Sequence, residues 1–325
     1  MLPHLVEPDV AGVLDGREED RRFPDQDRQS AQGVRDGLPG GRDLITLDQL
    51  PSITTFHDRP GDGIGPTRDS VDLDGRGGYD TYIVNLTGGM TDYRVNVLDT
   101  GAPNDGADTL TINGTDVQDI VLLRRVTELP GQMADAPAFV ALIKGTLDEV
   151  LDNLPTRPTE VERINYDENV NGRLTVNSFG GDDYFASDDT TAMVTLDGGA
   201  GNDSFQVGQL YRAERVFDAV APEDAFETID VTRGFLSRGI SLPMTIFGGT
   251  GEDQFTVYSN KAELRLEGND GNDTFLVRAF ALASNAKEFS TEETTEIDTG
   301  FGEDLIEYNI NAPVAIDGGA GFDTV

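Results

Sequence analysis

Short runs in which apolar and polar residues alternate recur along this chain. The alternation is typical of strands that bury one face, because successive side chains of a strand point to opposite sides. Such runs occupy residues 71–73, 82–84, 110–112, 174–176, 194–196, 205–207, 244–246, 255–257, 264–266, 275–277 and 314–316. The pattern predicts an all-β fold built from short strands.

Between these runs stands a repeated five-residue core: Gly, any residue, Asp, any residue, then an apolar residue. It occurs at residues 78–82, 106–110, 181–185, 201–205, 251–255, 271–275, 302–306 and 321–325. Composition alone would give roughly one or two matches, so this is an internal repeat. Strand, turn and strand form one unit that must stack on its neighbours to bury its apolar face. Ordinary hairpins are the alternative, but they do not require Gly and Asp at one offset eight times.

Three copies extend to Gly-Gly-x-Gly-x-Asp-x-apolar, at residues 198–205, 248–255 and 318–325. In this form the chain resembles the RTX, or haemolysin-type, calcium-binding repeat family, a nonapeptide β-helix repeat. The resemblance covers residues 71–85 and 173–325, with a weaker copy near 97–113. It implies a parallel β-roll or β-helix solenoid with calcium-binding glycine-rich turns. In that family the ion lies between two turns stacked on the same side and takes carbonyl and Asp oxygens from both.

The residue types suit that chemistry. Glycine permits the positive φ of a tight turn, and Asp adds a hard anionic oxygen. Calcium takes six to eight oxygen ligands, more than one turn supplies. The candidate aspartate ligands are Asp80, Asp183, Asp203, Asp253, Asp273, Asp304 and Asp323. The candidate glycines, which would offer carbonyls, are Gly198, Gly199, Gly201, Gly248, Gly249, Gly251, Gly268, Gly271, Gly302, Gly318, Gly319 and Gly321.

The spacing of the aspartates predicts which turns stack. A coil of two nonapeptides has about 18 residues. Asp183 and Asp203, Asp253 and Asp273, and Asp304 and Asp323 are each about one coil apart. The longer gaps must contain insertions or extra coils. Asp80 and Asp108 have no neighbour at coil spacing, so weaker or empty sites are expected there. The segment Gly41-Arg-Asp43 is either a decayed ninth copy or a chance match.

The chain divides into four predicted segments. Residues 1–50 are polar and are predicted to be a disordered or linker segment; residues 51–134 form a first β-solenoid segment with degenerate repeats; residues 135–158 form a helical insertion; and residues 159–325 form the main calcium-binding β-solenoid. The helix is predicted because Val140, Ile143, Leu147, Val150, Leu151 and Leu154 recur at helical spacing. Residues 209–240 and 278–294 are predicted to be insertions outside the stack.

Charge and composition exclude several classes of protein. The net charge is −36, with 60 acidic residues, which argues against binding nucleic acid or anionic membranes. An acidic surface adapted to solubility or a saline habitat contributes to the same excess. The chain has no Cys, and no apolar run is long enough to span a membrane. It shows no targeting segment and stops inside a repeat, so we expect it to be part of a longer protein.

Catalytic motifs are missing from the sequence. His4 and His57 are isolated, and neither a Gly-x-Ser-x-Gly elbow nor a phosphate-binding loop is present. We therefore expect no enzyme activity. The resemblance implies a calcium-binding structural or adhesive segment of a large secreted or cell-surface bacterial protein, folding as calcium binds. The alternative is the calcium-binding repeat region of a secreted RTX enzyme or toxin whose catalytic domain lies outside this chain. The expected partners are calcium ions, other segments of the same protein or a cell surface.

Overall fold

A computed structural model describes residues 42–48, 70–88, 93–97, 99, 106–125, 138–143, 161–215, 226–278, 294–309 and 312–325. This part of the chain is all-β, and most neighbouring strands are parallel. It contains no helix, and hence none with the length and apolar character needed to cross a membrane. The predicted all-β, largely parallel character is confirmed.

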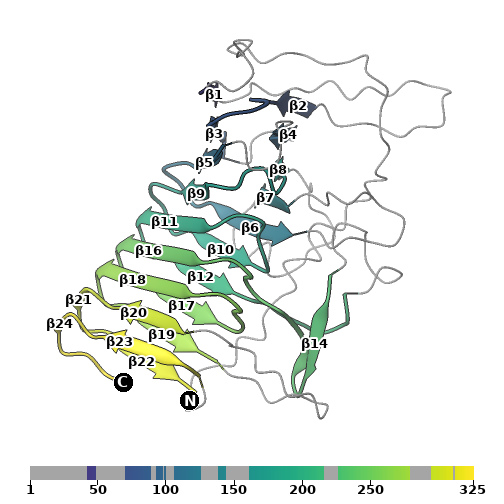
Figure 1. Cartoon of the computed structure of the whole chain (residues 1–325). Helices are drawn as coiled ribbons and strands as arrows, with labels where there is room; N and C mark the ends of the chain where they lie inside the picture. The colour runs from purple at the N-terminus through teal and green to yellow at the C-terminus, as the bar shows by residue number, and fades with distance from the viewer. Residues whose placement is uncertain are drawn as a thin grey trace, which may run out of the picture.

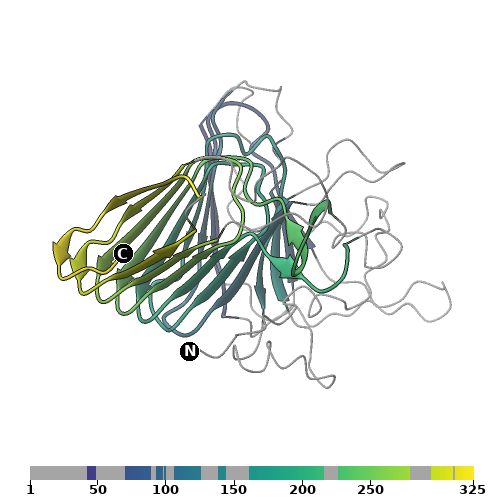
Figure 2. The same ribbon diagram turned by 90° about the horizontal axis from the view of Figure 1, so that it is seen from below.

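The strands form two large sheets, and the chain passes repeatedly from one to the other (Figures 1 and 2). The first sheet has the order β1 (Leu44–Leu47), β3 (Thr81–Asn85), β5 (Thr109–Asn113), β9 (Arg173–Asn177), β11 (Val194–Ala200), β16 (Met244–Thr250), β18 (Leu264–Asp270), β20 (Thr295–Asp298) and β23 (Val314–Asp317), with β21 (Phe301–Gly302) and β24 (Ala320–Gly321) beside this path. The second has the order β2 (Ser70–Leu73), β4 (Tyr93–Val97), β8 (Val161–Tyr166), β7 (Ala138–Ile143), β6 (Ile120–Arg125), β10 (Tyr184–Ser187), β12 (Ser204–Val207), β17 (Gln254–Val257), β19 (Thr274–Val277) and β22 (Leu305–Tyr308). Every strand run predicted from the sequence lies within one of these strands.

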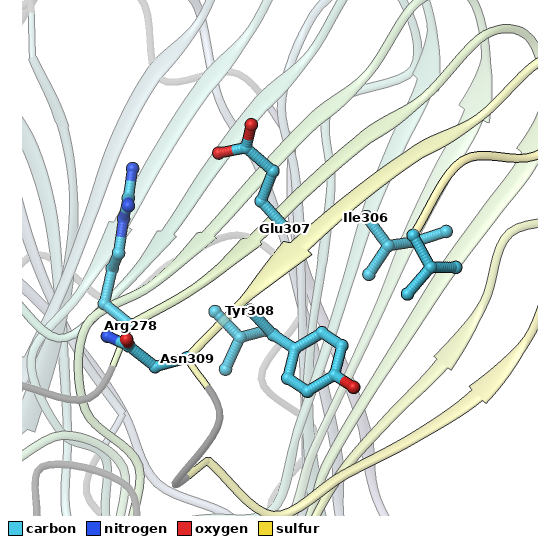
Figure 3. Close-up of a pocket in the computed structure, with 7 residues that line it drawn as sticks. Arg278, Ile306, Glu307, Tyr308 and Asn309 are labelled. Atoms are coloured by element: carbon cyan, nitrogen blue, oxygen red, sulfur yellow. The ribbon is translucent and has the colours of Figure 1, made fainter.

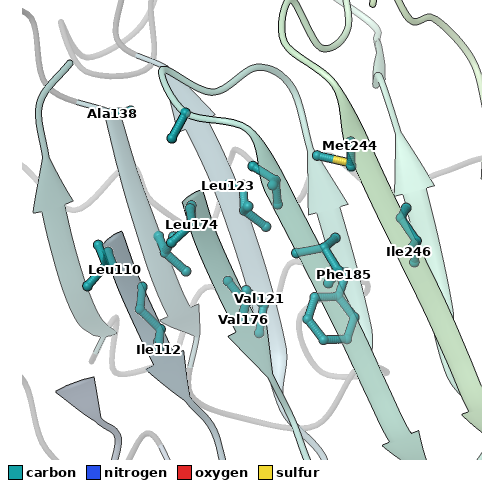
Figure 4. Packing of buried hydrophobic residues seen from close by; sticks show 14 of the residues in the cluster. Leu110, Ile112, Val121, Leu123, Ala138, Leu174, Val176, Phe185, Met244 and Ile246 are labelled. Atoms are coloured by element: carbon teal, nitrogen blue, oxygen red, sulfur yellow. The ribbon is translucent and has the colours of Figure 1, made fainter. Parts of the chain in front are cut away.

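The inward-facing side chains of both sheets make one continuous core. Leu110 and Leu174 of the first sheet pack in the same buried cluster as Val121 and Phe185 of the second (Figure 4). The rungs are in register, so identical positions stack. The rings of Phe185, Phe205, Phe255 and Phe275 lie with centroids 4.9, 5.1 and 4.6 Å apart along the second sheet. Because the apolar faces are buried between the two sheets and against neighbouring rungs, the stack sets the position of the turns.

The long gaps between repeats contain insertions. Although 50 residues separate Phe205 from Phe255, their strands β12 and β17 pair directly. The intervening segment includes a small antiparallel sheet of β13 (Leu210–Tyr211), β14 (Thr228–Val231) and β15 (Gly234–Ser237), which projects to one side of the stack (Figure 1). Tyr211 anchors it: its hydroxyl donates to Asp188 at 2.9 Å, and Asp188 forms a buried ion pair with Arg124 at 3.0 Å.

The helix predicted for residues 135–158 is wrong where the structure describes it. Ala138–Ile143 is strand β7, antiparallel to both of its neighbours, β6 and β8. All six of its residues are buried, and a run that is apolar on both faces carries no periodicity that separates a strand from a helix. Residues 144–158 lie outside the described residues. Neither large sheet is interrupted by residues 135–158. In the first sheet β5 pairs with β9, and in the second sheet β4 pairs with β8.

Strand β1 lies inside the range that the sequence assigned to a linker, residues 1–50. It pairs with β3 in register, with Ile45 opposite Tyr82. Ile45 and Leu47 are buried in the common core. The stack therefore begins at least one rung before residue 51.

Candidate metal centre

The repeat aspartates form two columns on opposite edges of the stacked sheets. The long column lies where the chain passes from the first sheet to the second, and consists of Asp119, Asp183, Asp203, Asp253, Asp273, Asp304 and Asp323. The short column lies where the chain returns to the first sheet, and consists of Asp43, Asp80, Asp108 and, in the same place, Asn171. The two columns share one turn motif, and they overlap along the sequence between residues 119 and 171.

Hydrogen bonds from rung to rung hold the long column together. The backbone N–H of Asp183 donates to Asp203 Oδ1, that of Asp203 to Asp253 Oδ1, that of Asp253 to Asp273 Oδ1, and that of Asp273 to Asp304 Oδ1, each at 2.8 Å. At the ends, Asp119 donates to Asp183 Oδ1 at 2.6 Å and Asp304 to Asp323 Oδ1 at 3.3 Å. The three pairs predicted from spacing are therefore in adjacent rungs. The insertions also leave Asp203 next to Asp253 and Asp273 next to Asp304.

The second carboxylate oxygen of these side chains, Oδ2, takes no part in this ladder of hydrogen bonds. Oδ2 of Asp183, Asp203, Asp253, Asp273 and Asp304 is buried and has no hydrogen-bond partner among the described residues. Each of these side chains is only 1–2% exposed. Buried polar atoms are nearly always hydrogen-bonded, because leaving a charged acceptor without a partner costs several kcal/mol. The column thus presents a row of buried carboxylate oxygens to which no described residue donates a hydrogen bond.

A bare glycine lies beside three of these oxygens. A β-carbon on Gly198 would overlap Asp203 Oδ2 and stand 2.7 Å from the carbonyl oxygen of Gly248, in the next rung. A β-carbon on Gly248 would overlap Asp253 Oδ2 and stand 2.8 Å from the Gly268 carbonyl oxygen. We call each such place, over a glycine five residues before its aspartate, a cradle. In each cradle a carboxylate oxygen and a carbonyl oxygen from adjacent rungs converge.

The third cradle, over Gly268, follows the same plan, with Asp273 Oδ2 and the carbonyl oxygen of Thr299. Other candidate glycines are required by backbone conformation. Gly251 has φ +142°, and a β-carbon there would overlap the carbonyl oxygen of Gly201. Positive φ is shared by Gly199, Gly201, Gly249, Gly271, Gly302, Gly319 and Gly321. The glycine pattern is therefore explained by close approach of successive turns.

Burial shapes the electrostatics of the long column. Burial raises the pKa of Asp183 and Asp253 to about 7, and that of Asp203 and Asp273 to about 6. The N–H groups donated from neighbouring rungs oppose this rise, and for Asp253 the adjacent carboxylates add to it. A cation in the cradles would favour the ionised carboxylates and reverse the rise.

The short column has the same ladder over fewer rungs. Asp80 Oδ1 accepts the Asp43 N–H at 2.8 Å, and Asp108 Oδ1 accepts the Asp80 N–H at 2.7 Å. Asn171 Oδ1 accepts the Asp108 N–H at 3.1 Å. The premise that Asp80 and Asp108 have no stacked neighbour is therefore wrong, because they lie in adjacent rungs although 28 residues separate them. The weaker or empty sites expected there stay a prediction. Asp43 occupies the ladder position that a ninth copy would have.

A third carboxylate joins the short column. Oxygen atoms of Asp80, Asp99 and Asp108 lie within 4.8 Å of one another, and all three residues are buried. The Tyr82 hydroxyl accepts the Gly75 N–H at 2.7 Å and donates to Asp99 Oδ2 at 3.4 Å. In the cradle over Gly75, this hydroxyl stands near Asp80 Oδ2, in the place that a backbone carbonyl takes in the long column.

Three members of these clusters were missed from the sequence: Asn171, which has an amide where the repeat has Asp, together with Asp119 and Asp99. Asp119 follows Val117, where the repeat has glycine, so the five-residue core does not detect it. A glycine five residues before the aspartate, here Gly114, is a signal that would have found it, as Gly75 does for Asp80. Asp99 follows β4 and reaches the site only through the fold. Nothing in the repeat indicates it.

One pocket lies apart from both columns, beside β19 and β22 (Figure 3). Arg278, Glu307, Tyr308 and Asn309 line it with Val277, Ile306 and Val325. It includes no Ser, Cys or His, and its ionisable side chains are those of Arg278, Glu307 and Tyr308. Searches against protein-family models, curated proteins and solved structures found no match to this chain. Its function must therefore be argued from the columns themselves.

Proposed function

We propose that this chain is a calcium-binding β-solenoid of the β-roll type, and that calcium occupies the cradles of the long column. The observation that carries the proposal is the row of buried Oδ2 atoms of Asp203, Asp253 and Asp273, each beside a carbonyl oxygen of the next rung. A cation in each cradle would supply the missing counterpart and neutralise the carboxylates. It would also tie adjacent rungs together.

The donor set favours calcium over other metals. The cradles offer carboxylate and carbonyl oxygens, which are hard ligands, and the chain has no Cys. Calcium accepts irregular shells of six to eight oxygens, whereas magnesium demands a compact octahedron and gives up its waters reluctantly. A cradle shared between two rungs suits the larger, more tolerant ion.

The proposed role is structural. An ion that binds only the folded stack adds RT ln(1 + [L]/Kd) to its stability. Extracellular calcium modules bind at about 10⁻⁴–10⁻³ M, well above cytosolic calcium levels. We therefore propose a stiffening or adhesive segment of a secreted or cell-surface protein, which completes its folding outside the cell. We also propose that the chain has no catalytic activity of its own.

Thermal unfolding followed by circular dichroism, in EGTA and then in millimolar calcium or magnesium, tests this function. We expect calcium to raise Tm by several degrees, since each site at about 10 Kd adds about 1.4 kcal/mol and 1 kcal/mol shifts Tm by about 2–4 °C in a protein of roughly this size. Magnesium should have a much smaller effect. The same spectrum and the same Tm in EGTA and in calcium would exclude the proposal.

Two variants give a matched control. Asp253→Asn removes a cradle carboxylate, whereas Glu252→Gln removes the same charge one residue away, at an exposed position. The first should weaken the calcium-induced rise in Tm, and the second should leave it nearly unchanged. If both variants reduce it equally, the effect of calcium is a general response of an acidic surface.

A further inference from the structure

The cradles of the long column are not all alike. Five residues before its aspartate, each turn has Gly114, Ser178, Gly198, Gly248, Gly268, Thr299 or Gly318 in rung order. Two of the seven positions therefore carry a hydroxyl side chain where the others carry none. They lie on either side of the three cradles over Gly198, Gly248 and Gly268.

Both hydroxyl groups donate a hydrogen bond to the equivalent backbone carbonyl oxygen of the next rung. Ser178 Oγ donates to the Gly198 carbonyl oxygen at 2.7 Å. Thr299 Oγ1 donates to the Gly318 carbonyl oxygen at 2.8 Å. These carbonyls correspond by position to those of Gly248, Gly268 and Thr299, which converge with an Asp Oδ2 in the three glycine cradles. A hydroxyl thus reaches the carbonyl that would otherwise face the cation.

The Ser178 hydroxyl also lies close to its own aspartate. It opposes the rise that burial causes in the pKa of Asp183. A further hydroxyl, that of Thr115, closes the first turn of the column. It donates to Asp119 Oδ1 at 3.1 Å, while the Thr115 N–H donates to Asp119 Oδ2 at 2.8 Å.

Of the five turns from Ser178 to Thr299, we propose that only the three cradles over Gly198, Gly248 and Gly268 bind calcium. The hydroxyls of Ser178 and Thr299 exclude the ion from the two flanking turns by engaging the carbonyl, although Oδ2 of Asp183 and Asp304 also has no hydrogen bond there. The inference rests on the proposed function of the long column. A neutral hydroxyl whose proton points at the carbonyl engages one of the oxygens that calcium needs. Its carbon atoms also fill the space that glycine leaves bare. Protein groups would therefore delimit a run of three ions along the edge.

The test is a count of bound calcium in the full chain. Equilibrium dialysis at a fixed free calcium concentration, followed by elemental analysis, gives the number of ions per chain. Because other acidic residues also bind calcium weakly, the readout is the difference between variants. Ser178→Gly and Thr299→Gly should each add one ion, and the double variant should add two. Ser178→Thr and Thr299→Ser keep the hydroxyl and should leave the number unchanged.

A variant that adds a hydroxyl tests the inference even if the glycine variants do not fold. Gly198→Ser should remove one ion, and it tests the same idea if a glycine variant gives no native β spectrum in calcium. An unchanged number in the glycine variants, with clear binding by the wild type, overturns this inference but not the proposed function. Loss of an ion in Ser178→Gly also overturns it, because the hydroxyl would then be a ligand. Absence of binding by the wild type overturns the proposed function itself.

Discussion

The two aspartate columns use the same turn motif but complete it differently. Two residues after its aspartate, the short column has Tyr82 and the long column has Phe205, Phe255 and Phe275. The Tyr82 hydroxyl extends back to the cradle over Gly75 and accepts its N–H at 2.7 Å. The phenylalanines have no polar atom to place there, and their rings stack on one another. The Tyr82 hydroxyl therefore adds a polar protein group beside one turn of the short column, and the phenylalanine turns of the long column have none.

The comparison also separates the contribution of charge from that of geometry. The short column gathers three carboxylates, Asp80, Asp99 and Asp108, within 4.8 Å, more than any one cradle of the long column has. Burial strongly raises the pKa of Tyr82, so its hydroxyl keeps its proton and can donate to Asp99. The closest gathering of carboxylates among the described residues is therefore in the short column. The long column differs by repetition, because Oδ2 lacks a hydrogen bond in five successive turns, those of Asp183, Asp203, Asp253, Asp273 and Asp304.

The largest expected effect concerns the ring stack behind the long column. Phe255 is 1% exposed and lies between the rings of Phe205 and Phe275. Phe255→Ala should lower the free energy of unfolding by about 3–5 kcal/mol, because it leaves a cavity in a packed core. Urea denaturation in saturating calcium measures this. A loss below about 1 kcal/mol would show that the rungs are not packed as described.

The second prediction sets the two columns against each other. Asp203→Asn and Asp108→Asn each remove one buried charge and keep an oxygen that can accept the ladder hydrogen bond. We expect Asp203→Asn to raise the calcium concentration at the titration midpoint about tenfold, because affinity depends on the number of charged ligands. Asp108→Asn should change it much less. Equal shifts would remove the distinction between the columns.

The sequence was sufficient for the repeating parts of this molecule. Alternation of apolar residues located the strands, and the Gly-x-Asp spacing located turns that share an edge. It was not sufficient where one residue's role depends on a distant rung. Residues 209–240 were predicted to be an insertion outside the stack, but the spacing allowed either insertions or extra coils, so it did not show that Phe205 and Phe255 are direct neighbours across 50 residues. The same holds for Asp99, whose place beside Asp80 and Asp108 arises from stacking.

Strand β7 shows a different limit. Val140 and Ile143 fit a helical spacing, yet they belong to a run that is buried on both faces between two antiparallel neighbours. Only the neighbouring strands, which supply backbone hydrogen-bond partners on both sides, favour the extended form. The local pattern of apolar residues does not show which strands, distant along the chain, a segment will pair with.

The third prediction is a dependence on pH that belongs to the long column. Burial raises the pKa of Asp183, Asp203, Asp253 and Asp273 to about 6 or 7, above the ordinary value of 3.8. Without calcium, the folded chain therefore holds more protons than the unfolded chain between about pH 4 and pH 7, and its stability falls as pH rises through that window. Calcium should offset this loss, so the rise in Tm that calcium causes should be larger at pH 8 than at pH 5.

Calcium titrations of thermal unfolding at these two pH values measure the difference. A variant with Asp203, Asp253 and Asp273 all changed to Asn should lose most of the dependence. If calcium raises Tm equally at pH 5 and pH 8, protons and calcium do not compete for the same carboxylates.

The smallest expected effect tests the hydroxyl that separates the two columns. Tyr82→Phe removes the acceptor of the Gly75 N–H and should cost about 1 kcal/mol in EGTA, the usual net value of one hydrogen bond. It also leaves the cradle over Gly75 with Asp80 Oδ2 and no phenol, as in the long column. Millimolar calcium should therefore restore more stability to Tyr82→Phe than to the wild type. Thr81→Ser, a half-buried neighbour that leaves the cradle intact, is the control. If calcium stabilises the Tyr82→Phe variant no more than it stabilises the wild type, the hydroxyl is not what keeps the short column from binding as the long column does.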